Sequence, residues 1–168
     1  MTFSFAENFS PESKVWIYQS NRSFTDSEIS EIDTAVNVFT KQWTAHDNQL
    51  KAAGKVLFNR FIILLVDESQ AGASGCSIDK SVHFIQEIET KFGVNLFDRL
   101  NLLFKQEKEF VTIPVSEVSR KISEGSINGQ SVFFNNTVQT LAELQTNWII
   151  QIGESWLASR LKKEVGKA

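Results

Sequence analysis

The sequence predicts an α+β fold in which a mixed or antiparallel sheet is covered by helices. Short runs rich in β-branched and aromatic residues alternate along the chain with stretches whose apolar residues recur every three or four positions. The first elements follow the order β-α-β-β-α-β, which is the order of the ferredoxin-like unit. Additional strands and a long C-terminal helix complete the expected architecture.

The first half of the chain is predicted to hold a strand, a helix and a β-rich segment. Lys14–Gln19 has the composition of a strand, and Thr25 with Glu28 forms a capping box that opens a helix. The β-rich segment Lys55–Asp67 is interpreted either as two strands that meet near Asn59–Arg60 or as one bent strand. The apolar face of the helix consists of Ile29, Ile32, Val36, Phe39 and Trp43.

The second half begins with a loop of small residues at 70–77 and a second amphipathic helix that Gly93 ends. Strands are predicted at Leu100–Lys105, Phe110–Pro114 and Ser131–Phe134, with a short helix at Val115–Glu124. The last predicted helix is the longest, Val138 to Lys163. Its apolar stripe is formed by Leu141, Leu144, Trp148, Ile149, Ile152, Trp156, Leu157 and Leu161.

Length and composition favour one domain over residues 1–168, in which residues 1–13 are expected to be loosely ordered. A net charge of −3 gives no electrostatic footprint for nucleic acid, and no apolar run reaches the roughly 20 residues of a membrane span. The single cysteine, Cys76, excludes an internal disulfide, and the N-terminus lacks the pattern of a signal peptide. The predicted location is the cytoplasm.

The segment 67–81 is the predicted functional site. Asp67 and Glu68 end a buried strand, and Gly72 to Gly75 form a loop whose backbone can approach a ligand closely. Ser74, Gly75, Cys76, Ser77 and Asp79 lie where the second helix begins, so free backbone N–H groups could bind an anion. The alternative is structural, because Ser77 or Asp79 is also what a helix N-cap requires.

Further residues are candidates for the same site. His46 follows the first helix and could act as a general base for Cys76 as nucleophile, although a histidine there also suits a helix C-terminus. Trp43 is a candidate ligand contact, and Arg60 and Arg99 are candidate counter-charges. No metal or cofactor is expected, since the spacings typical of zinc sites are absent; a carboxylate-held Mg²⁺ at the acidic residues is the weaker alternative.

The chain resembles a family of small uncharacterised bacterial proteins that often carry the automatic label "ABC transporter ATPase". The resemblance covers nearly the whole length, and the string Ser-Gly-Cys-Ser-Ile-Asp at 74–79 is its most specific part. The other segments that carry it are Trp43–His46, Arg60–Ile62, Val66–Glu68 and Leu96–Arg99. The label implies ATP hydrolysis, but the sequence has neither a Walker A loop nor a Leu-Ser-Gly-Gly-Gln signature, so ATPase activity is not expected.

Three functions stay open at the level of sequence. The first is a module that binds a small molecule or anion at 67–81. The second is a structural protein that binds a partner or forms a homodimer through its long C-terminal helix, whose tryptophans Trp148 and Trp156 lie on one face. The third is a cysteine-dependent enzyme with Cys76 and His46 as the catalytic pair.

Overall fold

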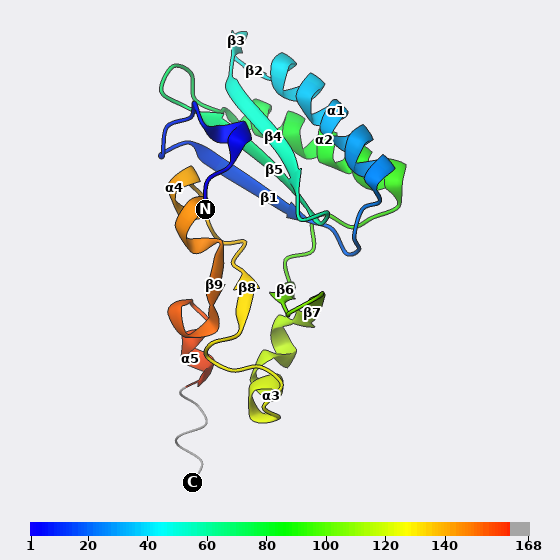
Figure 1. Ribbon diagram of the computed structural model, residues 1–168. Coiled ribbons are helices and arrows are strands. Elements are labelled where there is room, and N and C mark those ends of the chain that lie inside the picture. The colour runs from blue at the N-terminus through cyan, green and yellow to red at the C-terminus, as the bar shows by residue number, and fades with distance from the viewer. Residues whose placement is uncertain (162–168) are drawn as a thin grey trace. The chain divides into compact units, whose positions relative to one another are not determined.

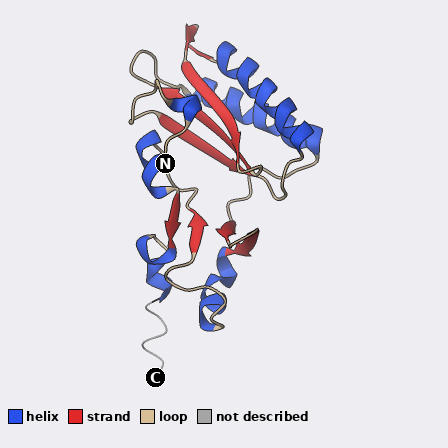
Figure 2. Ribbon diagram, viewed as in Figure 1, coloured by secondary structure: helices blue, strands red, loops and turns tan. Residues whose placement is uncertain are grey.

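The computed structural model describes residues 1–161 of the chain (Figure 1). Helices and antiparallel sheets both contribute, which confirms the α+β class (Figure 2). The chain divides into two compact units: Met1–Asp98 with Gln139–Gln145, and Arg99–Val138 with the residues from Thr146 onward. The single domain expected from the length stays a prediction. Within residues 1–161, no helix combines the length and the apolar character needed to cross a membrane.

The sheet of the first unit is antiparallel, with the strand order β1-β5-β4. β1 (Lys14–Gln19) and β4 (Lys51–Leu57) both pair with β5 (Phe61–Asp67), in which every residue is buried. The chain turns between β4 and β5 through Phe58 and Asn59, whose φ angles are 52° and 55°. Of the two interpretations of the β-rich segment, the pair of strands is therefore confirmed.

Two long helices, α1 (Asp26–Gln42) and α2 (Gly75–Phe92), lie on the same face of this sheet (Figure 1). The capping box of Thr25 and Glu28 opens α1, and Gly93 in the left-handed region ends α2, both as predicted. The core under the helices combines alternate strand residues with the apolar helix faces. It includes Ile62, Leu64 and Val66 from β5, Ile32 and Val36 from α1, and Ile85 and Ile88 from α2.

Gly54 in β4 sets how closely α1 packs on the sheet. A β-carbon at this position would lie 2.5 Å from Val36 Cγ1 and 2.8 Å from the carbonyl oxygen of Ile63. Real β-carbons do not approach other heavy atoms so closely, so glycine permits this distance between helix and strand.

A small hairpin joins α1 to β4 in the segment that the sequence left unassigned. Its strands are β2 (Thr44–Ala45) and β3 (Asn48–Gln49). His46 and Asp47 form the two-residue turn with φ angles of 49° and 63°, as a type I′ turn requires. His46 is therefore a turn residue and not the helix C-terminal residue that the sequence suggested.

The ferredoxin-like sheet is not confirmed. The strand predicted to complete it, β6 (Asn101–Lys105), lies in the separate sheet of the second unit. The outer edge of β1 is instead taken by Gln139 and Thr140: the Val15 N–H donates to the Gln139 carbonyl, and Lys14 forms a bridge with Thr140.

Residues 1–13, which the sequence predicts to be loosely ordered, make defined contacts within the first unit. A 3-10 turn, η1 (Ser4–Ala6), buries Ala6, and Phe3 is buried beside it. The carbonyl oxygens of Pro11 and Ser13 accept hydrogen bonds from the N–H groups of Ala142 and Leu141. The N-terminal segment is thereby fixed to α4 (Leu141–Asn147).

The second unit contains an antiparallel sheet in the order β7-β6-β8-β9. β6 is followed by β7 (Phe110–Pro114), β8 (Val132–Phe134) and β9 (Ile149–Gln151). The helical elements are η2 (Val115–Glu117), α3 (Val118–Ser123), η3 (Ile152–Glu154) and α5 (Ala158–Leu161). The core of this unit includes Leu102, Phe104, Ile113, Val118, Ile122, Phe133, Ile152 and Leu157.

The long C-terminal helix predicted from Val138 to Lys163 is wrong over the described residues, since positions 162 and 163 lie outside them. The segment is divided into α4, β9, η3 and α5. The Asn135 N–H donates to the Trp148 carbonyl, and β9 continues from there as a partner of β8. The β-branched pair Ile149–Ile150 suits this pairing, so the sheet contact outweighs the helical periodicity.

Candidate functional site

The predicted site lies in the first unit, where the chain leaves β5 and enters α2. Asp67 is buried, with 4% of its surface exposed. Its carboxylate accepts hydrogen bonds from the backbone N–H of Ser69 at 3.0 Å and of Ser10 at 3.3 Å, and from Lys51 Nζ at 3.2 Å. These bonds, that of Ser69 first, hold the pKa of Asp67 well below its usual range. Asp67 therefore joins the N-terminal segment, β4 and the loop after β5.

Glu68 closes the loop that follows. Its Oε1 accepts a hydrogen bond from the Ala73 N–H at 2.8 Å, and its Oε2 lies 3.0 Å from Lys14 Nζ. Both predicted ligand carboxylates are thus engaged by the chain itself.

The start of α2 is capped reciprocally by two serines. The Ser77 N–H donates to Ser74 Oγ at 3.2 Å, and the Ser74 N–H donates to Ser77 Oγ at 2.7 Å. The Ile78 N–H donates to the Ser74 carbonyl at 2.9 Å. Ser74 is therefore the N-cap, and Asp79 lies exposed in the second turn rather than at the cap.

The capping leaves the backbone N–H groups of Gly75 and Cys76 without a hydrogen-bond partner among residues 1–161. A β-carbon on Gly75 would meet nothing within 4 Å, and Cys76 is exposed. The first turn of α2 contains no acidic residue. Two donors at the positive end of the helix dipole therefore face solvent.

Trp43 supports this helix start from the core side. Its side chain is 1% exposed, and its Nε1–H donates to the Ser77 carbonyl at 2.8 Å. The structure thus places Trp43 at the predicted site, but inside the protein and behind the first turn of α2.

The remaining predicted residues are not brought together with this junction in the same way. His46 is exposed at the tip of the β2–β3 hairpin, and no hydrogen bond joins it to Cys76 within the described chain. Arg60 is buried in the turn before β5, so it is separated from Asp67 by the strand, about 20 Å at the usual rise per residue. Burial lowers the pKa of the Arg60 guanidinium. Arg99 belongs to the second unit.

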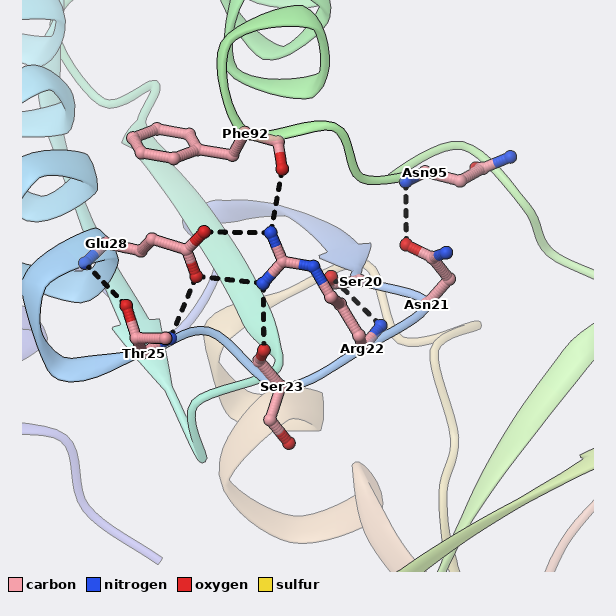
Figure 3. Close-up of polar contacts among 8 residues, drawn as sticks. All are labelled: Ser20, Asn21, Arg22, Ser23, Thr25, Glu28, Phe92 and Asn95. Atoms are coloured by element: carbon pink, nitrogen blue, oxygen red, sulfur yellow. Dashed lines mark hydrogen bonds and ion pairs between the residues drawn. The ribbon is translucent and has the colours of Figure 1, made fainter.

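A polar cluster that sequence reasoning missed joins the start of α1 to the end of α2 (Figure 3). Both guanidinium nitrogens of Arg22 donate to the Glu28 carboxylate at 2.8 Å, and Arg22 Nη2 also donates to the Phe92 carbonyl at 2.7 Å. A cation at the last carbonyl of a helix complements its dipole. The capping box signalled Glu28, but nothing in the sequence signalled its partner.

The described residues contain no group of three or more histidine, cysteine, aspartate or glutamate side chains placed to hold a metal ion. No protein-family profile, curated protein or solved structure matches the chain. The family resemblance of the sequence therefore stays a prediction, and functional inference rests on the residues of the chain itself.

Proposed function

We propose that the chain is a binding module for a small anion, a phosphate or carboxylate group, held at the start of α2. The observation that carries this proposal is the pair of solvent-facing N–H groups of Gly75 and Cys76, left free while the Ser74–Ser77 box occupies its neighbours. Backbone N–H groups at a helix N-terminus bind anions because the donors and the helix dipole act together.

The side chains around these amides favour a ligand of modest affinity. Gly75 adds no side chain that would shield the N–H groups. Lys80 follows Cys76 by four residues, and long side chains on a helix lean toward its N-terminus, so its ammonium adds positive charge. Asp79 follows Cys76 by three residues and opposes an anion. The expected dissociation constant is about millimolar, typical of a few charge-assisted hydrogen bonds in water.

A proline at position 75 tests the proposal directly. The N–H of Gly75 is at the first helical position, where proline is tolerated, and Ser74 already has the extended backbone (φ −98°, ψ 168°) that precedes proline. Gly75→Pro should keep the fold and remove one donor, whereas the matched control Gly75→Ala keeps the donor.

The measurement is a titration with phosphate and with acetate, followed by the amide NMR shifts of α2. In the natural protein and in Gly75→Ala, the Cys76 amide is expected to shift and saturate. In Gly75→Pro, the apparent dissociation constant should rise at least about fivefold, as expected for one lost charge-assisted hydrogen bond. Shifts that do not saturate, or equal affinity in the two variants, would count against the site.

We also keep three broader features as proposals. The order β1-α1-β4-β5-α2, with both helices on one face, supports a relation to the ferredoxin-like arrangement. The exposed thiol of Cys76 suits a reducing compartment such as the bacterial cytoplasm. The exposure of Cys76 is also the observation that favours a cysteine-dependent enzyme, in which His46 would have to approach it.

A further inference from the structure

One edge of the sheet in the second unit carries free backbone groups. β9 is the last strand in the order β7-β6-β8-β9. Next to it, the Ile152 N–H donates to the Ser131 carbonyl, and Ile150 lies opposite Phe133. Because hydrogen-bonded and non-bonded pairs alternate in an antiparallel ladder, the N–H and C=O groups of Ile149 and Gln151 point away from β8. No partner for them exists in residues 1–161.

The other sheet edges of the chain are occupied or protected. The edge of β1 is covered by Gln139, and at the edge of β4 the Val56 N–H donates to Asp33 Oδ1 at 2.8 Å. The edge strand β7 ends in Pro114, which has no N–H to offer. β9 contains neither a charged residue nor a proline, the devices that keep edge strands from pairing.

A hollow of about 580 Å³ runs beside β9. All three residues of β9 line it, together with Lys105, Glu107 and Glu154. The lining carries both signs of charge, so this surface can face a copy of itself without opposing only like charges. These observations indicate an interface and favour a self-complementary partner.

We propose that β9 pairs antiparallel with β9 of a second copy of the chain, about a two-fold axis at Ile150. In this register Ile149 lies opposite Gln151 of the second copy, and each such pair exchanges both N–H···O bonds. Glu154 lies opposite Thr146 of the second copy, so the pairing opposes no like charges. A two-fold contact of this kind is isologous and closed, as in most homodimers. The sheet then continues through both copies.

Sedimentation velocity from micromolar to millimolar protein tests the pairing with two substitutions at one position. Gln151→Pro removes the outward N–H, and proline is tolerated at an edge position of this kind. The matched control Gln151→Thr keeps the N–H and favours strand structure. Gln151 is exposed, so neither change disturbs the core.

The natural protein and Gln151→Thr are expected to form a concentration-dependent dimer. Gln151→Pro should weaken it about tenfold or more, because each copy loses one hydrogen-bond donor. A natural protein that stays monomeric throughout the range, or a dimer that Gln151→Pro leaves unchanged, overturns the proposal. If circular dichroism shows that Gln151→Pro does not fold, hydrogen exchange of the natural protein decides: the Ile149 and Gln151 amides must exchange more slowly as concentration rises, and unchanged exchange overturns it.

Discussion

The indole N–H of Trp43 donates a hydrogen bond to the backbone carbonyl of Ser77 across 2.8 Å, and both residues are buried. Trp43 caps the C-terminus of α1, and Ser77 lies in the first turn of α2. The Trp43 ring also packs against the rings of Phe39 and Trp16, with centroids 5.0 Å and 5.8 Å apart. One side chain therefore fixes the end of one helix against the start of the other.

Trp43→Phe is expected to lower the free energy of unfolding by about 2 kcal/mol, because it removes the donor to Ser77 and leaves unfilled volume in the core. Chemical denaturation measures this loss. Trp156→Phe is the control, since Trp156 is 44% exposed and should lose less than about 1 kcal/mol. Equal losses in the two variants would show that the buried bond adds nothing to stability.

Gly54→Ala is expected to destabilise the first unit by about 1–3 kcal/mol, although alanine is otherwise acceptable in a strand. The added methyl group would meet Val36 Cγ1 at 2.5 Å and the Ile63 carbonyl oxygen at 2.8 Å, so α1 must move away from β4. The control is Gly75→Ala, where the β-carbon meets no atom within 4 Å and alanine favours the helix. Urea titrations of both variants test the contrast, and a neutral Gly54→Ala would contradict it.

The elements with strong local signals were predicted correctly from the sequence. The strand Lys14–Gln19 has the predicted bounds, Thr25 and Glu28 form the predicted capping box, and Gly93 adopts the left-handed conformation that ends α2. In each case a few neighbouring residues determine the structure, through β-branched composition, side-chain capping or backbone freedom. Local chemistry was sufficient there.

The C-terminal segment shows where local signals mislead. Trp148, Ile152 and Leu157 are fully buried, and their spacing of four and five residues fits a helical stripe. In the structure they lie in or beside β9 and η3, where burial has other causes. The decisive contact is the pairing of β9 with β8, which joins residues that are distant in sequence, and periodicity alone carries no information about it.

The predicted site was recognised as a place but not in its contacts. Strand-end carboxylates and a loop of small residues marked the β5–α2 junction correctly as polar. Their partners depend on strand register: Lys51 lies opposite Asp67 and reaches its carboxylate, and Ser10 arrives from the N-terminal segment. Register is a property of the whole sheet, so the sequence could not show that Asp67 and Glu68 are already engaged.

The Arg22–Glu28 pair predicts a defined dependence of stability on pH. The hydrogen bonds from Arg22, and then that from the Thr25 N–H, lower the pKa of Glu28 from 4.5 to about 2. A carboxyl group whose pKa is lower in the folded state stabilises the protein above its unfolded pKa, and this stabilisation is lost as pH falls. The loss attributable to Glu28 should therefore occur between pH 4.5 and about 2.

Glu28→Gln is expected to lower the melting temperature at neutral pH and to reduce its decline between pH 5 and pH 2, which thermal unfolding at several pH values measures. Part of the decline should remain, because the pKa of Asp67 is also lowered. Glu7→Gln is the control, since Glu7 is exposed and has no side-chain hydrogen bond within residues 1–161. An unchanged pH profile in Glu28→Gln would show that the pair contributes nothing to acid sensitivity.

Asp79→Asn should strengthen the binding of an anion at the start of α2. Asp79 follows Cys76 by three residues and is exposed on the same side of the helix, so its carboxylate repels a ligand held by the Gly75 and Cys76 amides. Asparagine keeps the shape and removes the charge. We expect the affinity for phosphate to rise about two- to fivefold at low ionic strength, because charges one helical turn apart in water interact by about 1 kcal/mol or less.

Salt and a distant substitution separate this effect from a general change of charge. The gain should shrink at high salt, since exposed charges are screened. Asp26→Asn changes the net charge equally but lies beside Thr25, at the end of α1 that Arg22 joins to the far end of α2, and should leave the affinity unchanged. NMR titrations of the α2 amides provide both measurements. A loss of affinity in Asp79→Asn would mean that this carboxylate contacts the ligand, as a cation or hydrogen-bond donor would require, and would exclude an anion held by the amides alone.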